Sequence, residues 1–244
     1  MKEIIERVVK ETVDTSGMPY YRNPLFGYAD AVDPIFSRLK EAVGPGHLLP
    51  RDLLPEARTV FAFFLPFQKR ILENNRSGET ASREWAEVYI ATNRLIAEIT
   101  AELKNTMAKE GVRLESQPPT YVFDRKLLIA NWSHRHIAYA CGLGTFGRNN
   151  LLITRKGCGG RFGSAVLDIL LEPSPRPDEI HHCFHQSRRC SYCLQICPVR
   201  AITPAEFHRQ ACYAQCLKND RYFNDLETSD VCGKCAAGPC GYLD

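Results

Sequence analysis

The sequence has no long hydrophobic run and no low-complexity tract. Its longest apolar stretches, such as residues 60–67, are far shorter than the roughly 20 residues that cross a bilayer. The amino-terminal segment is charged from Lys2 onward and lacks the apolar core of a signal peptide. These absences argue against membrane-spanning and exported proteins, and they predict a cytoplasmic protein without a membrane partner.

An excess of charge of one sign is also missing. The chain has 31 Lys and Arg against 28 Asp and Glu, a formal net charge of +3. Nucleic-acid binding needs a concentrated basic face, and so small an excess gives no argument for one. The rest of the composition, 44% hydrophobic and 24% charged over 244 residues, is typical of one large globular domain or of a core domain with a small appendage.

Hydrophobic periodicity predicts a mixed α and β structure over residues 1–175. The expected elements are an amphipathic amino-terminal helix, helices over 34–42, 80–110 and 133–141, strands over 58–66, 151–154 and 163–171, and an extended piece over 120–123. Ser82 is the expected N-cap of the long helix and Gly111 its end. Residues 172–178 are rich in proline, and a domain boundary is expected there, with a second domain over 176–244.

Cysteine is the residue in excess. Nine of the eleven cysteines lie between Cys183 and Cys240. Stable disulfides are not expected in a reducing compartment, and an odd number pairs poorly, so the density indicates metal binding.

The first cysteine motif is Cys190-Ser-Tyr-Cys193-Leu-Gln-Ile-Cys197-Pro198. Bacterial-type iron–sulfur proteins use closely spaced thiolates for one cluster and a Cys-Pro cysteine for the other. The expected first cysteine of this run is replaced by Ser187. Either Cys183 reaches in from a longer loop, the interpretation that we favour, or the first cluster has an incomplete or non-cysteine ligand set.

The second motif is Cys232-Gly-Lys-Cys235-Ala-Ala-Gly-Pro-Cys240. A crossed pattern would give Cys183, Cys190, Cys193 and Cys240 to one [4Fe–4S] cluster. The other cluster would take Cys197, Cys232, Cys235 and either Cys212 or Cys216. Paired C-x2-C motifs also suit zinc, with His181, His182 and His185 as further donors, but the Cys-Pro ending favours clusters.

A glycine-rich loop lies upstream, in Cys141-Gly-Leu-Gly-Thr-Phe-Gly-Arg-Asn-Asn-Leu-Leu-Ile153. It follows a helix and precedes a strand, which is the reverse of the dinucleotide-binding order. The pattern predicts a tight backbone loop that approaches a flat or bulky group, with Arg148 and Asn149 at its exit.

This loop, followed by Arg161-Phe-Gly-Ser164 and two cluster motifs, resembles the epoxyqueuosine reductase family over roughly residues 50–240. Reductive dehalogenases and short corrinoid-associated iron–sulfur proteins are similar. The resemblance implies an α/β (α+β) nitroreductase-like core that can hold cobalamin, followed by a ferredoxin-like module with two [4Fe–4S] clusters. By the same resemblance, the residues bordering the corrinoid would be Gly142, Leu143, Gly144, Thr145, Phe146, Gly147, Arg148, Asn149, Phe162, Gly163 and Ser164.

The sequence also departs from the family pattern. The family's proton donor is an aspartate upstream of the loop. Asp124 is the nearest candidate, although it lies about four residues too far upstream and is equally typical of a surface carboxylate. His134 and His136 are alternative proton donors or cobalt ligands, or structural histidines. The tRNA-acting members have a carboxyl-terminal extension, whereas this sequence stops at Asp244, so tRNA is not expected as a partner.

The preferred hypothesis is therefore a redox protein that passes single electrons through two clusters to a bound or partner corrinoid, with a target other than tRNA. A ferredoxin or flavodoxin would donate the electrons. Two alternatives stay open: an epoxyqueuosine reductase that acts on tRNA, and a simple electron carrier without a corrinoid.

Overall fold

The centre of the molecule is an antiparallel sheet of four strands in the order β1-β2-β8-β3. The computed structural model describes residues 1–118, 123–176, 183–185 and 189–244. The strands are β1 (Leu25–Asp30), β2 (Thr59–Pro66), β8 (Gly160–Leu167) and β3 (Leu114–Glu115). A sheet built from antiparallel pairs alone, flanked by helices, is a mixed α and β fold, as the periodicity predicts.

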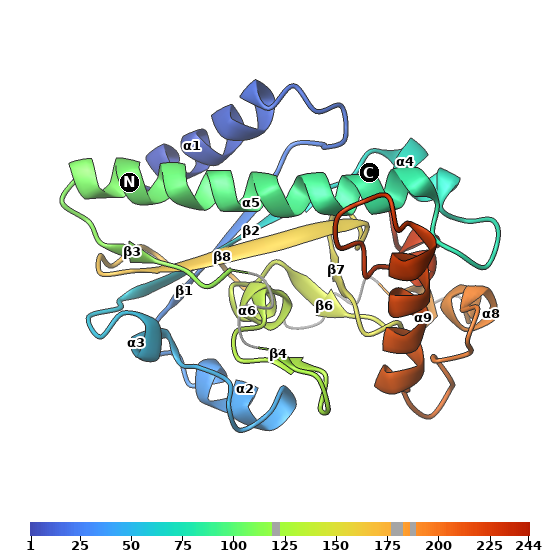
Figure 1. Cartoon of the computed structure of the whole chain (residues 1–244). Coiled ribbons are helices and arrows are strands. Elements are labelled where there is room, and N and C mark those ends of the chain that lie inside the picture. The colour runs from blue at the N-terminus through green and yellow to red at the C-terminus, as the bar shows by residue number, and fades with distance from the viewer. Residues whose placement is uncertain (119–122, 177–182, 186–188) are drawn as a thin grey trace.

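Strand β2 is buried along its whole length because helices cover both faces of the sheet. Phe61, Phe63 and Leu65 face one hydrophobic cluster, whereas Val60 and Phe64 face the other. Successive side chains of a strand point to opposite faces, so two covered faces require a continuous apolar run. Figure 1 shows α1 (Lys2–Thr15) and α5 (Arg83–Lys109) on one side and α2 (Ile35–Ala42), α3 (Pro50–Leu53) and α6 (His134–Ala140) on the other.

Helix α5 begins where the sequence predicts. The Ser82 hydroxyl accepts a hydrogen bond from the backbone N–H of Trp85 at 3.2 Å, as an N-cap does. Gly111 adopts a positive φ of 73° directly beyond the helix. Among the described residues, neither this helix nor any other is long and apolar enough to cross a membrane.

Two short hairpins lie beneath the sheet near α6. They are β4 (Phe123–Asp124) with β5 (Ile129–Ala130), and β6 (Gly144–Phe146) with β7 (Leu152–Thr154). The glycine-rich segment is therefore half of a hairpin rather than a loop alone. A Cβ at Gly144 would lie 2.2 Å from the carbonyl oxygen of Ile153, so the close strand pairing requires glycine there. Part of the predicted extended piece, residues 120–122, lies outside the described residues.

The cysteine-rich segment lies beside one end of the sheet, as Figure 1 shows for α8 (Tyr192–Ile196) and α9 (Arg209–Tyr222). Helix α4 (Lys69–Asn74) and the 3-10 turn η1 (Lys234–Ala237) are the remaining elements of the described residues. The hydrophobic core does not stop at the predicted boundary, because Phe223, Ala236 and Ala237 belong to the same cluster as α5. The boundary near residue 175 stays a prediction.

The last residues are bound to distant parts of the chain. The guanidinium of Arg22 donates to the carbonyl oxygen of Leu243 at 2.8 Å and also to that of Lys156, and it stacks 3.9 Å above the ring of Tyr242. The N–H of Gly159 donates to the carbonyl oxygen of Gly241 at 2.8 Å. These contacts fix the segment that contains Cys240.

Candidate metal centre

Four cysteines that the sequence assigns to one cluster are neighbours in the structure. Cys183, Cys190, Cys193 and Cys240 line one narrow cavity, together with Cys235. The pKa of Cys193 is raised to about 11 by burial and then by the charges of Cys240, Cys183 and Cys190. Burial and mutual repulsion therefore favour neutral thiols here, and a bound cation would be needed to hold them together as thiolates.

A second group forms around α9 and η1. The pKa of Cys235 is raised by burial and by the charges of its neighbours Cys212, Cys232, Cys193 and Cys197. Cys232 is affected in the same way, with Cys212 and Cys197 as its cysteine neighbours.

Backbone and side-chain contacts hold this second group in place. The N–H of Ala201 donates to Cys197 Sγ at 3.2 Å. The buried ammonium of Lys234 donates to the carbonyl oxygen of Asn75 at 3.0 Å, and Asn75 Nδ2 donates to that of Cys232, also at 3.0 Å. Asn75, which directly follows α4, therefore positions the cysteines near η1.

Cys212 and Cys216 are not equivalent. They lie one turn apart on α9, and their thiols are hydrogen-bonded to each other. This hydrogen bond lowers the pKa of Cys212 to about 7 and, with burial, raises that of Cys216. Cys212 is the one of the two whose charge acts on both Cys232 and Cys235.

Two cysteines outside the motifs have different surroundings. Cys158 is buried, and its thiol is hydrogen-bonded to that of Cys240. Cys141 is fully buried, and its Sγ lies 3.5 Å from the carbonyl oxygen of Val60. The first is therefore part of the thiol region, and spacing alone did not reveal it.

No three His, Cys, Asp or Glu side chains in the described part of the chain lie close enough together to hold a single metal ion. The nine predicted ligands, Cys183, Cys190, Cys193, Cys197, Cys212, Cys216, Cys232, Cys235 and Cys240, are all described, and metal binding by them stays a prediction. His181 and His182 lie outside the described residues.

The exit of the glycine-rich segment reaches the thiols. Asn149 is buried, and its Nδ2 donates to the carbonyl oxygen of Cys235 at 3.3 Å and to Cys158 Sγ at 3.8 Å. Arg148 lines the cavity of the first thiol group. Gly147 directly follows β6, and its N–H donates to the carbonyl oxygen of Leu151 at 2.9 Å.

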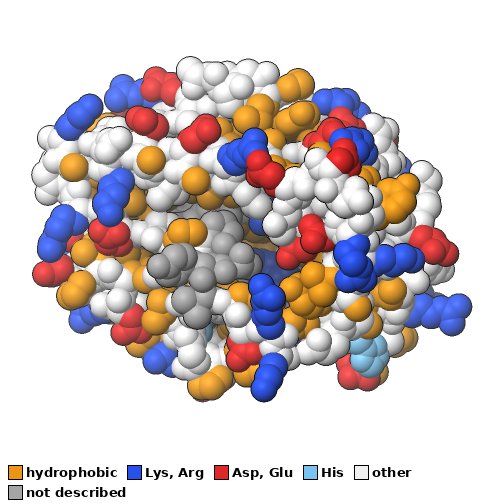
Figure 2. All heavy atoms as spheres, viewed as in Figure 1, with side chains coloured by type: hydrophobic (Ala, Val, Ile, Leu, Met, Phe, Trp, Pro, Cys, Tyr) orange, Lys and Arg blue, Asp and Glu red, His pale blue; other side chains and the backbone are white. Residues whose placement is uncertain are grey.

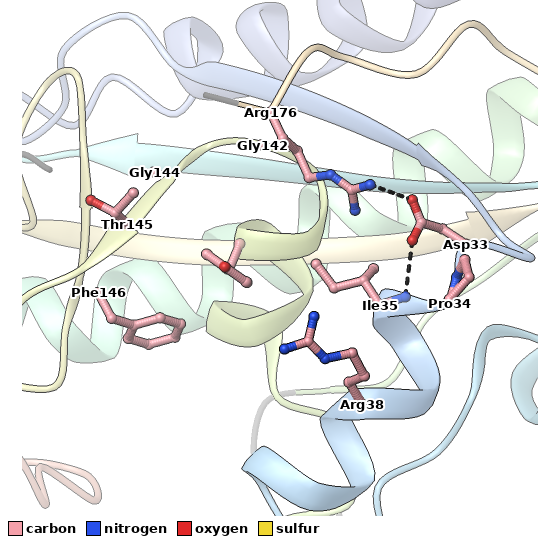
Figure 3. A pocket seen from close by; sticks show the side chains of 10 residues that line it. Asp33, Pro34, Ile35, Arg38, Gly142, Gly144, Thr145, Phe146 and Arg176 are labelled. Atoms are coloured by element: carbon pink, nitrogen blue, oxygen red, sulfur yellow. Dashed lines mark hydrogen bonds and ion pairs between the residues drawn. The ribbon is translucent and has the colours of Figure 1, made fainter. Parts of the chain in front are cut away.

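The beginning of the same segment faces a different pocket. Gly142, Gly144, Thr145 and Phe146 line a cavity of about 570 Å³, shown in Figure 3, whereas Leu143 is packed in the core. Two arginines also line this cavity: Arg38 from α2, and Arg176, which lies beside Gly142 and is paired with Asp33 at 2.6 Å. The predicted corrinoid-bordering residues therefore do not all line one space.

The predicted residues of β8 form another wall near the thiols. Phe162 stacks on Phe64 with ring centroids 4.5 Å apart, and a Cβ at Gly163 would collide with the ring of Phe63. Ser164 Oγ accepts from Trp132 Nε1 at 3.0 Å and is hydrogen-bonded to His134 Nδ1 at 2.7 Å. Burial lowers the pKa of His134 to about 4, so this histidine is neutral at neutral pH.

Arg135 is the main residue that the sequence analysis missed. It lines two cavities, of about 350 and 360 Å³, which also share Ser133 and Leu151. Its Nε is fully enclosed, with no hydrogen-bond partner in the part of the chain that the structure describes. Burial lowers its pKa to about 10, whereas the nearby charges of Cys235 and Cys212 favour its charged form. Its position between two histidines in the sequence gave no signal of this.

Asp124 is exposed at the end of β4. Its Oδ1 accepts hydrogen bonds from the N–H groups of Lys126 and Leu127, at 2.8 and 2.9 Å, and so caps its own turn. Its neighbour Phe123 lines the 350 Å³ cavity with Cys212. The catalytic role of Asp124 stays a prediction.

With this geometry in view, the chain can be compared with known proteins. Over 158 residues it is 27% identical to the epoxyqueuosine reductase of Pseudomonas aeruginosa, a match that covers 63% of this chain and 40% of that protein. The resemblance to epoxyqueuosine reductases is confirmed. No protein-family model matches the chain.

Solved epoxyqueuosine reductases share the fold. The enzyme of Bacillus subtilis, in a form with its catalytic aspartate loop swung out of the active site, aligns with a TM-score of 0.56 and 18% identity over 97% of this chain and 66% of its own. An epoxyqueuosine reductase with an epoxyqueuosine-modified tRNA-Tyr stem loop aligns with a TM-score of 0.51 and 20% identity. This alignment covers 88% of this chain and 58% of that enzyme. A catabolic reductive dehalogenase also has a similar fold. The chain thus spans at most about two thirds of these epoxyqueuosine reductases.

Two predictions are wrong in the light of these relatives. The relatives are epoxyqueuosine reductases, which contradicts the preferred hypothesis of electron transfer to a corrinoid with a target other than tRNA. One of them holds a tRNA stem loop, which contradicts the expectation that tRNA is not a partner. Net charge was a poor guide because phosphate binding depends on where basic side chains lie and not on their sum. The expectation of an oxidoreductase agrees with the names of the relatives.

Proposed function

We propose that this chain is an oxidoreductase of the epoxyqueuosine reductase type, which reduces a modified nucleoside in tRNA with electrons carried by iron–sulfur clusters. The observation that carries the proposal is the grouping of thiols: two sets of neighbouring cysteines lie beside a glycine-rich hairpin in a fold shared with epoxyqueuosine reductases. In this proposal residues 176–244 are the ferredoxin-like module, and residues 1–175 are the nitroreductase-like core.

The donor chemistry fits two [4Fe–4S] clusters. Each cluster takes four thiolates, and the two groups supply Cys183, Cys190, Cys193 and Cys240 for one and Cys197, Cys212, Cys232 and Cys235 for the other. Such clusters transfer one electron at a time. Arg135 lies between the second group and the two cavities, where its buried positive charge would offset the negative charge of a thiolate-bound cluster.

Cobalamin belongs to the proposal as a second cofactor. The support is the pair of cavities that meet at Ser133, Arg135 and Leu151, with Phe162 as an aromatic wall; a corrinoid is larger than either cavity and would have to occupy both. Neutral His134 lines one of them, where it could orient a ligand without adding charge.

The proposed tRNA contact involves the face drawn in Figure 2. Lys and Arg side chains lie beside a hollow on this face, together with Asp and Glu side chains. Lys and Arg next to a concave site would pair with the phosphates of a stem loop. A small electron-carrier protein would supply the reducing equivalents.

The decisive experiment uses protein that has been purified and reconstituted without oxygen. The protein is incubated with a chemical reductant and an epoxyqueuosine-modified tRNA stem loop, with and without cobalamin, and the nucleosides are analysed by mass spectrometry. We expect iron and sulfide for two clusters, and loss of one oxygen atom from the modified nucleoside when cobalamin is present. The same incubation with Cys193→Ala should leave the nucleoside unchanged. Iron-loaded wild-type protein that neither binds the stem loop nor alters its nucleoside would refute the proposal.

A further inference from the structure

Cys158 is attached to the first thiol group by its backbone as well as by its side chain. Its N–H donates to the carbonyl oxygen of Cys240 at 3.0 Å, and the following N–H, of Gly159, donates to that of Gly241 at 2.8 Å. The two segments therefore run side by side and hold the two thiols in hydrogen-bonding contact. Asn149 Nδ2, at 3.8 Å, donates to the sulfur of Cys158 from another direction. The thiol proton of Cys158 is thus left to point at Cys240.

Cys216 has the same relation to the second group. It lies one helical turn beyond Cys212 on α9, and the two thiols are hydrogen-bonded. Cys212 is near Cys232, Cys235 and the guanidinium of Arg135, and so it faces the group. Cys216 lines the same cavity as Cys212 and lies near Cys232, but only Cys212 also lies near Cys235 and Arg135.

The chemistry of a cluster determines the direction of both hydrogen bonds. A cysteine bound to iron is a thiolate and has no proton, so an adjacent free thiol can only donate. Hydrogen bonds to a ligand sulfur stabilise the reduced, more negative cluster and raise its reduction potential.

We propose that Cys158 and Cys216 are not ligands, and that each donates a hydrogen bond to a cluster ligand, Cys158 to Cys240 and Cys216 to Cys212. They are positioning residues that set the reduction potentials of the two clusters, one for each cluster. This inference rests on the proposed function, because it requires clusters at both thiol groups. It also accounts for the cysteine count: eight ligands, two donors, and Cys141 in the core.

The test compares single variants of the full chain, prepared without oxygen and titrated electrochemically with detection by electron paramagnetic resonance. Cys158→Ala and Cys216→Ala should keep the full iron content. Each should make a different cluster harder to reduce. The expected change is about tenfold in the equilibrium constant for one-electron reduction, which corresponds to a reduction potential lower by about 59 mV. Cys240→Ala and Cys212→Ala should each lose the iron of one cluster, and the spectrum that remains assigns the signals.

Cys141→Ala is the matched control. It removes an equally buried thiol whose partner is the backbone of Val60, and both potentials should stay as in the wild type. Iron loss in Cys158→Ala or Cys216→Ala would show that the substituted cysteine is a cluster ligand. Unchanged reduction potentials in these variants would show that the cysteine has no hydrogen-bonding role. Either result would overturn the inference while leaving the proposed function intact. Wild-type protein without iron–sulfur signals would instead refute the proposed cofactors, and this inference with them.

Discussion

Helices α5 and α9 are held in the molecule by different forces. Helix α5 buries a stripe of nine residues: Trp85, Ala86, Val88, Thr92, Leu95, Ile96, Ile99, Leu103 and Met107. All of them except Thr92 are apolar or aromatic. Helix α9 buries only Gln215 and Asn219. The first helix is stabilised by the hydrophobic effect and needs no cofactor, whereas the second depends on hydrogen bonds and, in our proposal, on iron bound to Cys212.

Removal of iron should separate the two regions most clearly. Chelation under anaerobic conditions should expose the backbone of α9 and η1, because binding energy of a metal centre is folding energy for the segment around it. Hydrogen exchange measured by mass spectrometry should show lost protection there and retained protection in β2. Equal loss in both regions would mean that the sheet also depends on the clusters.

Truncation of the α5 stripe should be the next largest effect. Leu95 is fully buried, and Leu95→Ala should lower the free energy of unfolding by about 2–5 kcal/mol because it removes packed methyl groups and leaves a cavity. Glu102→Ala, on the exposed face of the same helix, is the control and should change it little. Chemical denaturation with a spectroscopic readout of the sheet decides between them.

On α9, substitution of a buried amide should cost less. Asn219 Nδ2 donates to the carbonyl oxygen of Val231 at 2.8 Å, and Asn219 Oδ1 accepts from Gln215 at 3.0 Å. Asn219→Ala leaves the Val231 carbonyl without this donor and removes one of the two hydrogen bonds of Gln215 Nε2, which keeps its bond to the carbonyl oxygen of Glu79, and it should destabilise α9 by about 1–3 kcal/mol. Local opening measured by hydrogen exchange is the test. If the exchange rates of α9 stayed unchanged while those of α5 rose, the buried amide side chains of α9 would not be what stabilises this helix.

The effect that is smallest at neutral pH is a pH dependence of the core beneath the sheet. The pKa of His134 falls from its ordinary value of 6.5 to about 4 on folding, so the unfolded chain takes up the proton first. Stability is then complete above about pH 6.5 and falls as the pH drops toward 4, by at most about 1.4 kcal/mol per pH unit. His134→Asn should flatten this dependence in urea titrations, whereas His208→Asn, at an exposed histidine, should not.

The same contrast explains what the sequence could predict about the fold. The bounds of α5 were predicted to within three residues because Ser82, an apolar stripe and Gly111 are local signals. Helix α9 has no apolar face and was not predicted. Strand β1 was missed because Gly27 lies at its centre, and glycine is required there only by the carbonyl oxygen of Cys141, which a Cβ would approach to 2.4 Å.

For the candidate site, spacing carried information only within each motif. It predicted which thiols lie together in the first group, because those in Cys190-x2-Cys193 are near in sequence and the crossed pattern supplies Cys240. It did not separate Cys212 from Cys216, since both lie on one helix. Cys158 and Arg135 were missed because the hairpin and α6 bring them to the thiols only in the folded chain, and Asn149 was predicted as a cofactor-bordering residue but not as a neighbour of the thiols.

The contact of Arg22 with Leu243 has a consequence for biosynthesis. Its two partners are 221 residues apart, and the same segment positions Cys240. During translation the sheet and α5 emerge from the ribosome well before residue 240, so the nascent chain can fold its apolar half first. Loading of the proposed cluster at Cys240 must therefore follow the folding of the apolar half, after Cys240 itself has left the exit tunnel.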